Sequence, residues 1–479
     1  MRCSARRFLV GLALVAPSVV VHSWVPRSLL NKKTGSTALQ MKTSTKTASS
    51  PLPKLPLPDP ICSTEPGTWA YDTMSRRVDE EILERTWQDN KETWEKPEWK
   101  VVKERFEALR EELRSAATTQ LTYLDELPEG ASEMRQREWS EWKLALEPFV
   151  EKQDTWLSAP WMVTEFYVYR RLIQCLDYFN PDSVGYLYDP FVPQKRAGLE
   201  SSVTSADAML KRIPELPPNA AGLEIAASIA LWGNKMDLSL WPANVSQANQ
   251  DIFSEILNAA QENLLHDDSA ALAEHCEKLR ESQNGDVDII VDNAGFELVT
   301  DLALAQYLIE SGIAQTVTFQ LKSHPTFVSD ALEKDLVETV EYYASLDQEQ
   351  YPHAHAAGQR WKEFLASGKW QCQENSFWVQ GFAMWEMHED LREDLATRCD
   401  LAFVKGDANY RRLLGDRPWD TSAPFGDVVG AYFPCPVCAL RTLKAELGCG
   451  MAKEQTERAQ ALDDAWMTNG RFGVVHFSQ

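Results

Sequence analysis

Acidic residues are absent from the first 58 positions of this 479-residue chain, although nine lysines and arginines lie there. The basic start precedes the apolar run 8–21, which is too short for a membrane span and is typical of a signal peptide. Residues 24–54 are basic and rich in serine and threonine, as transit peptides are. We expect residues 1–58 to form a presequence and spacer that directs the protein to a plastid, with secretion, a mitochondrial destination and a cytoplasmic location as alternatives.

The rest of the chain also lacks long apolar runs, an excess of basic charge and a regular pairing of cysteines. No later segment has the length of a transmembrane helix, so we expect no stable membrane association once the presequence is removed. The 48 basic and 71 acidic residues give a net charge of −23, which argues against a nucleic-acid partner. Nine scattered cysteines indicate a mostly reduced protein. Cys435 and Cys438 form a lone CxxC, which we interpret as a turn because a zinc site needs a second pair.

The periodicity of apolar residues changes near residue 280. Charged amphipathic patterns over 74–94, 101–117 and 134–150 predict helices with little strand content. Strand and helix patterns alternate from residue 281 onward. We therefore predict an α/β fold, a three-layer α/β/α Rossmann-like sheet with an N-terminal helical subdomain. The helical part should cover 67–280 and the α/β catalytic part 281–479, as one integrated fold over 67–479.

Two successive strand–loop–helix units carry oxygen-bearing side chains. The apolar strand 287–291 runs into Asp292, Asn293, Ala294 and Gly295, and a helical pattern follows. A second strand, 316–322, leads through a loop to Asp330 and another helix. Successive βα units run parallel with a right-handed crossover, so both loops should lie at the carboxyl edge of the sheet, where α/β proteins bind ligands. An ordinary turn would also explain Asp292 and Asn293. With Asp330 beside them, the three residues could share one metal ion.

Two further segments add a carboxylate and cations. The strand 401–405 reaches Gly406 and Asp407 before a short basic helix. In 438–446, Arg441 and Lys444 are three residues apart, which would place them on one face of a helix. Hard oxygen ligands together with cations suit a phosphate ester and a divalent metal ion.

The four segments resemble the metal-dependent damage-control phosphatases. The similar blocks are Asp-Asn-Ala-Gly-Phe-Glu at 292–297, Phe-Val-Ser-Asp at 327–330, Lys-Gly-Asp-Ala-Asn-Tyr-Arg at 405–411 and Arg-Thr-Leu-Lys at 441–444, with supporting blocks at 161–171 and 231–237. The subfamily with an Arg-Thr-x-Lys signature is the most similar; its members act on sugar phosphates and have also been described as protein-glutamate methyltransferases. The resemblance extends from about residue 70 to about residue 450.

This resemblance implies a site and a reaction. It implies manganese, cobalt or nickel bound by Asp292, Asn293 and Asp330, and magnesium also suits such oxygen ligands. The expected activity is hydrolysis of a small-molecule phosphate ester such as fructose 1-phosphate, with Asp292 and Asp407 as catalytic residues. Glu297 should face the opening of the site from the first turn of its helix, and Lys444 should hold phosphoryl charge. The complete expected substrate-binding set is Asp292, Asn293, Glu297, Asp407, Ala408, Asn409, Tyr410, Arg411 and Lys444.

Two segments depart from the expected pattern or add to it. Ala408 and His324 occupy positions where other members often differ, and His324 could contact phosphate. The resemblance also places Asn234 in the pocket, whereas Gly233-Asn234 alone predicts a helix end. Glu165 and the Arg170-Arg171 pair lie on a predicted helix, where we favour an ordinary surface ion pair over a contact in a cleft.

Other functions fit fewer residues. Methyl transfer from S-adenosylmethionine is the first rival, and Gly448 and Gly450 lie in a segment that resembles its glycine-rich loop. That loop should precede most of its domain, so we interpret 446–450 as a helix stop. A non-catalytic binding protein is the second rival, and the intact candidate ligands argue against it. His353 and His355 form a His-x-His pair that we interpret as part of a solvated loop.

Overall fold

The computed structural model describes residues 51–127, 129–233 and 261–479. The expected signal and transit segments, Asn234 and Asp237 lie outside the described residues. Ordered contacts begin before the expected start at residue 67, because the backbone N–H of Ile61 donates to the carbonyl of Asp416 at 3.0 Å. In the described part of the chain, no helix has both the length and the apolarity needed to cross a membrane.

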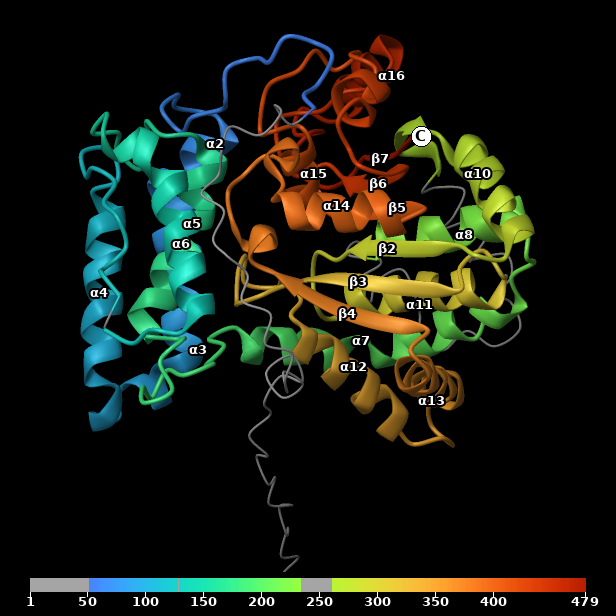
Figure 1. Ribbon diagram of the computed structural model, residues 1–479, viewed down its shortest axis with the longest axis horizontal. Helices are drawn as coiled ribbons and strands as arrows, with labels where there is room; N and C mark the ends of the chain where they lie inside the picture. Colours follow the sequence, from blue (N-terminus) through green and yellow to red (C-terminus); the bar gives the residue numbers. More distant parts are fainter. Residues whose placement is uncertain (1–50, 128, 234–260) are drawn as a thin grey trace, which may run out of the picture. The chain divides into compact units, whose positions relative to one another are not determined.

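The N-terminal half of the described chain is helical, as predicted (Figure 1). The three helical patterns expected from the sequence correspond to a π-helical segment joined to α3, then α4 and α5. Helices α6, α7 and α8 follow. The bounds are α2 (Trp69–Asp72), the π-helical segment (Thr73–Leu83), α3 (Glu84–Trp94), α4 (Lys100–Arg114), α5 (Glu133–Val150), α6 (Trp161–Leu176), α7 (Val192–Leu210) and α8 (Ala220–Trp232).

A seven-stranded sheet forms the C-terminal half, in the order β1-β7-β6-β5-β2-β3-β4. All neighbouring strands are parallel except β6 and β7. The strands are β1 (Leu264–Asp267), β2 (Asp286–Ile290), β3 (Thr316–Lys322), β4 (Trp370–Asn375), β5 (Leu401–Lys405), β6 (Val437–Thr442) and β7 (Gly473–Ser478). The helices among them are α10 (Ser269–Ser282), α11 (Phe296–Glu310), α12 (Glu333–Ser345), α13 (Pro352–Ser367), α14 (Glu389–Arg398), α15 (Asp407–Leu413) and α16 (Lys453–Leu462).

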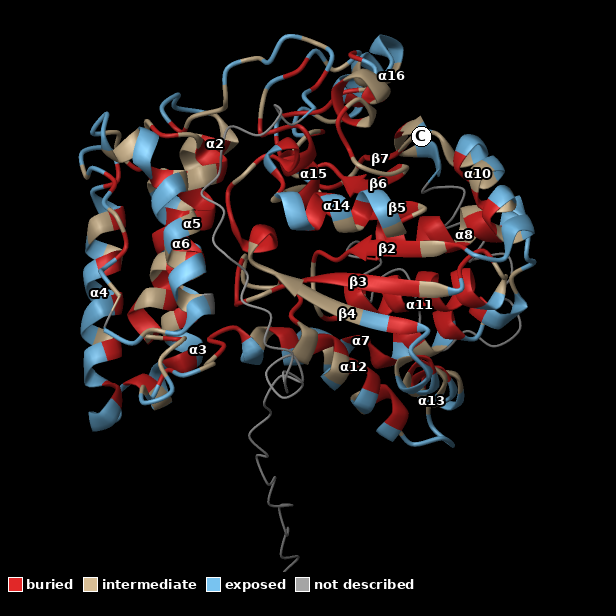
Figure 2. Cartoon of the chain, viewed as in Figure 1, coloured by how far each residue is buried: buried red, intermediate tan, exposed pale blue. Residues whose placement is uncertain are grey.

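Helices cover both faces of the sheet, which confirms the predicted α/β class. Val287 and Ile289 of β2 belong to a core shared with α8, α11 and α13, whereas Ile290 belongs to a core shared with α14, α15 and the N-terminal helices. Alternate residues of a strand point to opposite faces, so a strand buried on both sides reads as a continuous apolar run. Figure 2 shows the central strands as almost entirely buried.

The strand order reverses between β2 and β5. From β2 the chain proceeds outward to β3 and β4 and then returns to place β5 on the other side of β2. At such a reversal the loops leaving the two strands diverge and leave room for a ligand at their carboxyl ends. Asp292 follows β2 and Asp407 follows β5, so the reversal lies at the predicted site.

Several sequence predictions about local structure are wrong. Arg441 lies in strand β6 instead of a helix, because β6 is a short apolar run that pairs with β5 and β7. The segment at 446–450 therefore follows a strand and is not a helix stop. Strands β1, β4 and β7 were not predicted. His353 and His355 lie inside α13.

Candidate active site

The loops after β2 and β3 meet, as the sequence predicts. Asn293 and Asp330 form an isolated backbone bridge. The N–H of Ala331 donates to the carbonyl of Asp292 at 2.9 Å, and the N–H of Ala294 donates to the carbonyl of Ser329 at 2.6 Å. These bonds bring Asp292, Asn293 and Asp330 together at the carboxyl edge of the sheet.

Asp292 is the side chain around which the site is built. It is buried, and its Oδ2 accepts a hydrogen bond from Nδ2 of Asn293 at 2.9 Å. Its Oδ1 is also buried and has no hydrogen-bond partner within the described structure. Burial raises the pKa of Asp292 well above its usual value, and the nearby charges of Asp330 and Glu297 raise it further. A carboxylate oxygen left without a donor in this way is ready to bind a cation.

Asn293 joins the candidate ligand Asp292 to Glu297. Its Nδ2 also donates to Oε2 of Glu297 at 2.8 Å, which leaves its amide oxygen as an acceptor. That oxygen accepts from Oγ of Ser329 at 2.5 Å. Both Asn293 and Glu297 line a cavity of about 460 Å³. The expected position of Glu297 at the opening of the site stays a prediction. The wall of this cavity formed by α7 carries Ser201, Ser202 and Ser205.

Asp330 has a lysine partner that the sequence prediction missed. Nζ of Lys322 lies 3.0 Å from Oδ2 of Asp330 and donates to Oδ1 of Asn409 at 3.4 Å. Burial raises the pKa of Asp330, and Lys322 opposes that rise. The available signal is the position of Lys322 as the last residue of a strand whose alternate residues Val317, Phe319 and Leu321 are apolar. A lysine rarely enters such a strand without a buried partner.

The three candidate ligands fit a hard divalent cation. They offer two carboxylates and an amide oxygen, and Oδ1 of Asp292 has no hydrogen-bond partner in the described structure. The negative charges of Asp330 and Glu297 raise the pKa of Asp292, whereas the positive charge of Lys322 lowers it. Within the described ranges, no three His, Cys, Asp or Glu side chains form a metal-binding cluster by themselves. The candidate set differs from such a cluster because Asn293 is its third member.

Asp407 is held by the Arg-Thr-Leu-Lys segment. Nε of Arg441 donates to Oδ1 of Asp407 at 2.7 Å, and the backbone N–H of Lys444 donates to the same oxygen at 3.0 Å. The remaining donors of Arg441 bind the carbonyls of Leu447 at 2.7 Å and Ala445 at 3.1 Å. These hydrogen bonds fix the guanidinium of Arg441, which in turn holds the carboxylate of Asp407 in one orientation. Lys444 is among the cations whose charge lowers the pKa of Asp292, so its charge acts on the candidate ligands.

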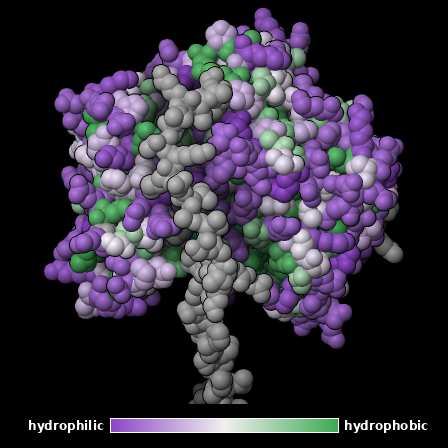
Figure 3. Space-filling model, viewed as in Figure 1, coloured by the Kyte–Doolittle hydropathy of each residue, from purple (hydrophilic) through white to green (hydrophobic). Residues whose placement is uncertain are grey.

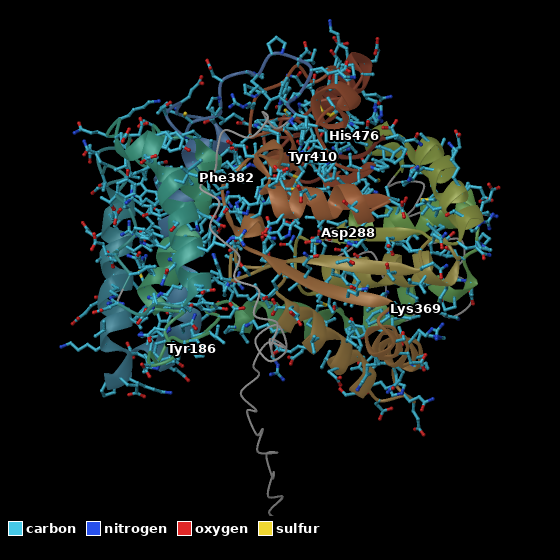
Figure 4. The ribbon with its side chains drawn as sticks, viewed as in Figure 1. Tyr186, Asp288, Lys369, Phe382, Tyr410 and His476 are labelled. Carbon is cyan, nitrogen blue, oxygen red and sulfur yellow. The ribbon has the colours of Figure 1, made fainter. Side chains whose placement is uncertain are left out.

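The residues after Asp407 have internal partners. Ala408 is half-buried in the first turn of α15, and Nδ2 of Asn409 donates to the carbonyls of Val291 at 3.2 Å and Lys405 at 3.0 Å. The hydroxyl of buried Tyr410 lies 3.2 Å from Nδ1 of His476, and Figure 4 shows the two residues as neighbours. The contact of Ala408, Asn409 and Tyr410 with substrate stays a prediction.

Arg411 connects α15 to α6. Its guanidinium binds Asp416 at 2.8 and 3.0 Å and Glu165 at 2.6 Å. The guanidinium carbon also lies 3.6 Å from the centroid of the Trp161 ring. Direct substrate binding by Arg411 likewise stays a prediction, because these partners occupy its donors.

The predicted surface ion pair on α6 is wrong. Glu165 is buried against Arg411, and Arg170 is buried in a two-bond pair with Glu138 at 2.5 and 2.8 Å. Burial also lowers the pKa of His324 to about 3, so its ring is neutral near pH 7. The contact of His324 with phosphate stays a prediction.

Comparisons with known proteins identify similar sequences. A family model described as the damage-control phosphatase ARMT1-like domain matches residues 71–459, which include the helical half and most of the sheet. The chain is 34% identical to damage-control phosphatase ARMT1 of Danio rerio over 360 residues, 71% of this chain and 78% of that protein. The protein of the same name from Homo sapiens is 29% identical over 441 residues, 88% of this chain and 98% of that protein.

Proposed function

The chain belongs to the ARMT1-like damage-control phosphatase family, and from this premise we propose that it hydrolyses sugar phosphate monoesters with the help of a divalent cation. The observation that carries the proposal is the buried, unpartnered Oδ1 of Asp292 beside Asn293 and Asp330. This oxygen set lies where the strand order reverses, which is the ligand-binding position of open α/β sheets.

Asp292, Asn293 and Asp330 would hold the cation, which we propose to be manganese, cobalt, nickel or magnesium. When bound, such an ion polarises a phosphoryl group and makes a water molecule more acidic. Lys322 keeps Asp330 in place through its 3.0 Å ion pair and limits the repulsion among the carboxylates. Burial and then the charges of Asp330 and Glu297 keep the pKa of Asp292 high, and a bound cation would favour the charged form of this carboxyl.

Lys444 and Asp407 would act on the substrate. Lys444 would hold the charge that spreads over the phosphoryl oxygens as the bond to the sugar breaks. Asp407 has 13% of its side chain exposed, and Arg441 fixes its orientation through Oδ1. It would therefore orient a sugar hydroxyl or pass a proton to the departing sugar oxygen. Asn409, Tyr410 and Arg411 would hold α15 beneath it.

The cavity supports a polyhydroxylated substrate. Ser201, Ser202 and Ser205 of α7 line the cavity together with Asn293 and Glu297, so hydroxyl, amide and carboxylate groups surround it. Its volume of about 460 Å³ is near the lower end of the roughly 300–1,000 Å³ of small-molecule sites. Fructose 1-phosphate and related hexose or pentose phosphates are the substrates we propose.

Phosphate release from a panel of these esters tests the proposal. Metal-stripped protein should be inactive and should recover when manganese, cobalt, nickel or magnesium is restored. Asp292→Ala should remain inactive with every metal, whereas the matched variant Asp420→Ala, at an exposed position, should behave as the wild type. Metal-independent release would refute the role of the cation. Consumption of S-adenosylmethionine without phosphate release would favour methyl transfer instead.

The destination of the protein remains a separate proposal. We propose a plastid location from the basic, acid-free segment 1–58. A fluorescent protein fused after residue 58 should enter plastids, and a fusion to residue 59 onward should not. Entry into mitochondria or the secretory pathway alone would contradict the proposal.

A further inference from the structure

The turn that carries Asp330 has an unusual backbone conformation. Phe327 and Val328 have φ angles of 46° and 63°, so two successive residues other than glycine are left-handed. This region is disfavoured for residues with a Cβ atom, and most strongly for a β-branched residue such as Val328. The turn needs contacts elsewhere in the molecule to keep this conformation.

Those contacts come from α6. The ring of Phe327 packs edge-on against Phe166 at a centroid distance of 4.7 Å and lies 4.9 Å from the ring of Tyr169. Phe166 and Tyr169 are both buried in the core that the N-terminal helices share with α14 and α15. We call Phe166, Tyr169 and Phe327 the aromatic clamp. It anchors the first residue of the left-handed pair to a helix that is distant in sequence.

The turn is also joined directly to the candidate ligands. The N–H of Ser329 donates to the carbonyl of Phe327 at 2.6 Å, which closes the turn. Oγ of Ser329 donates a hydrogen bond to Oδ1 of Asn293, and the carbonyl of Ser329 accepts one from the N–H of Ala294. A change in backbone at Phe327 or Val328 would therefore move Asp330 and release Asn293 at the same time.

We propose that the aromatic clamp is a positioning device that holds the turn left-handed and thereby sets the affinity of the site for its divalent cation. None of its three residues is among the proposed cation ligands Asp292, Asn293 and Asp330, so we class the aromatic clamp as a set of positioning residues. The inference rests on the proposed metal-dependent function, since it concerns the same three ligands. It adds that the N-terminal helical half, through α6, is part of the metal-binding apparatus.

Binding of Mn²⁺ to the full chain, followed by the electron paramagnetic resonance signal of free Mn²⁺, measures this effect without relying on activity. Phe327→Ala should weaken Mn²⁺ binding at least tenfold while the protein still unfolds cooperatively. Phe106→Ala is the matched control: Phe106 is equally part of the helical core and packs on Trp94 at 4.9 Å. It should bind Mn²⁺ as the wild type does.

A second substitution separates the clamp from general packing. Glycine adopts positive φ angles without strain, so Val328→Gly should bind Mn²⁺ as tightly as the wild type. In the Phe327→Ala background, Val328→Gly should recover most of the lost affinity, although it restores no packing. A purely structural role of Phe327 predicts no such recovery.

Each outcome has a distinct meaning. If the wild type binds no Mn²⁺ and releases no phosphate with manganese, cobalt, nickel or magnesium, the proposed metal-dependent function fails. If the wild type binds and Phe327→Ala binds equally well, or if Val328→Gly recovers nothing, the clamp inference is overturned. Should Phe327→Ala fail to fold, Tyr169→Leu removes one clamp contact, and unchanged Mn²⁺ affinity in that variant would overturn the inference.

Discussion

Gly406 makes room for the carboxylate of Asp292. A Cβ atom at residue 406 would overlap Oδ2, Cγ and Cβ of Asp292. Gly406 also has a φ angle of +82°, which glycine adopts without strain. The end of β5 can therefore approach the end of β2 closely, and the two halves of the site meet at this contact.

Gly406→Ala should displace Asp292 and reduce phosphatase activity at least a hundredfold. The positive φ angle alone costs about 1–3 kcal/mol for a residue with a Cβ atom. Gly368→Ala is the control, because Gly368 has a φ angle of +77° but open space around it. Both variants should lose stability in urea unfolding, and only Gly406→Ala should lose activity. Equal activities in the two variants would contradict the overlap with Asp292.

Lys444→Ala should lower kcat/KM about a hundredfold, in the range found when one electrostatic stabiliser of a transition state is removed. The backbone of Lys444, not its side chain, binds Asp407, so the variant should keep the stability of the wild type. Lys453→Ala, at an exposed position, serves as the control and should change neither quantity. Wild-type kinetics in Lys444→Ala would remove this lysine from the mechanism.

A buried pair behind the site makes stability depend on pH. Oδ1 of Asp301 lies 2.9 Å from Nζ of Lys405, and burial raises the pKa of Asp301 to about 7. The native protein therefore binds more protons at this position than the unfolded chain, whose Asp titrates near its ordinary value of about 3.9. The contribution of Asp301 to stability is fully present below that ordinary value and is lost as pH rises through about 7.

Asp301→Asn should remove this part of the pH dependence. Between pH 5 and pH 7 the free energy of unfolding of the wild type should fall relative to that of the variant, by up to about 1.4 kcal/mol per pH unit. Urea unfolding of both proteins at several pH values gives the comparison. If the difference between them stays constant with pH, Asp301 does not titrate in this interval.

The meeting of Asp292, Asn293 and Asp330 could be predicted from the sequence because each step depends on local signals. Two apolar strands end in polar loops, helices follow, and the right-handed crossover leaves one arrangement for the loops. Strand β6 was mistaken for a helix because a short apolar run fits both structures, and only its pairing with β5 and β7 decides between them.

Local sequence patterns do not predict contacts between residues that are far apart in the chain. Glu165 and Arg411 are 246 residues apart, and no local pattern identifies them as a buried pair. The same holds for Phe327 and α6, whose contact depends on how the helical half packs against the sheet. Lys322 could have been singled out as a charge in a buried strand, but its partner Asp330 only becomes evident in the folded chain.

Anomalous diffraction at the manganese absorption edge, from crystals of the active protein soaked in Mn²⁺, shows whether Asp292, Asn293 and Asp330 bind the cation. We expect one strong peak at about 2.0–2.5 Å from oxygens of Asp292, Asn293 and Asp330. The peak should disappear in Asp292→Ala crystals. Manganese bound only at other residues, in a protein that releases phosphate with manganese, would contradict this metal site.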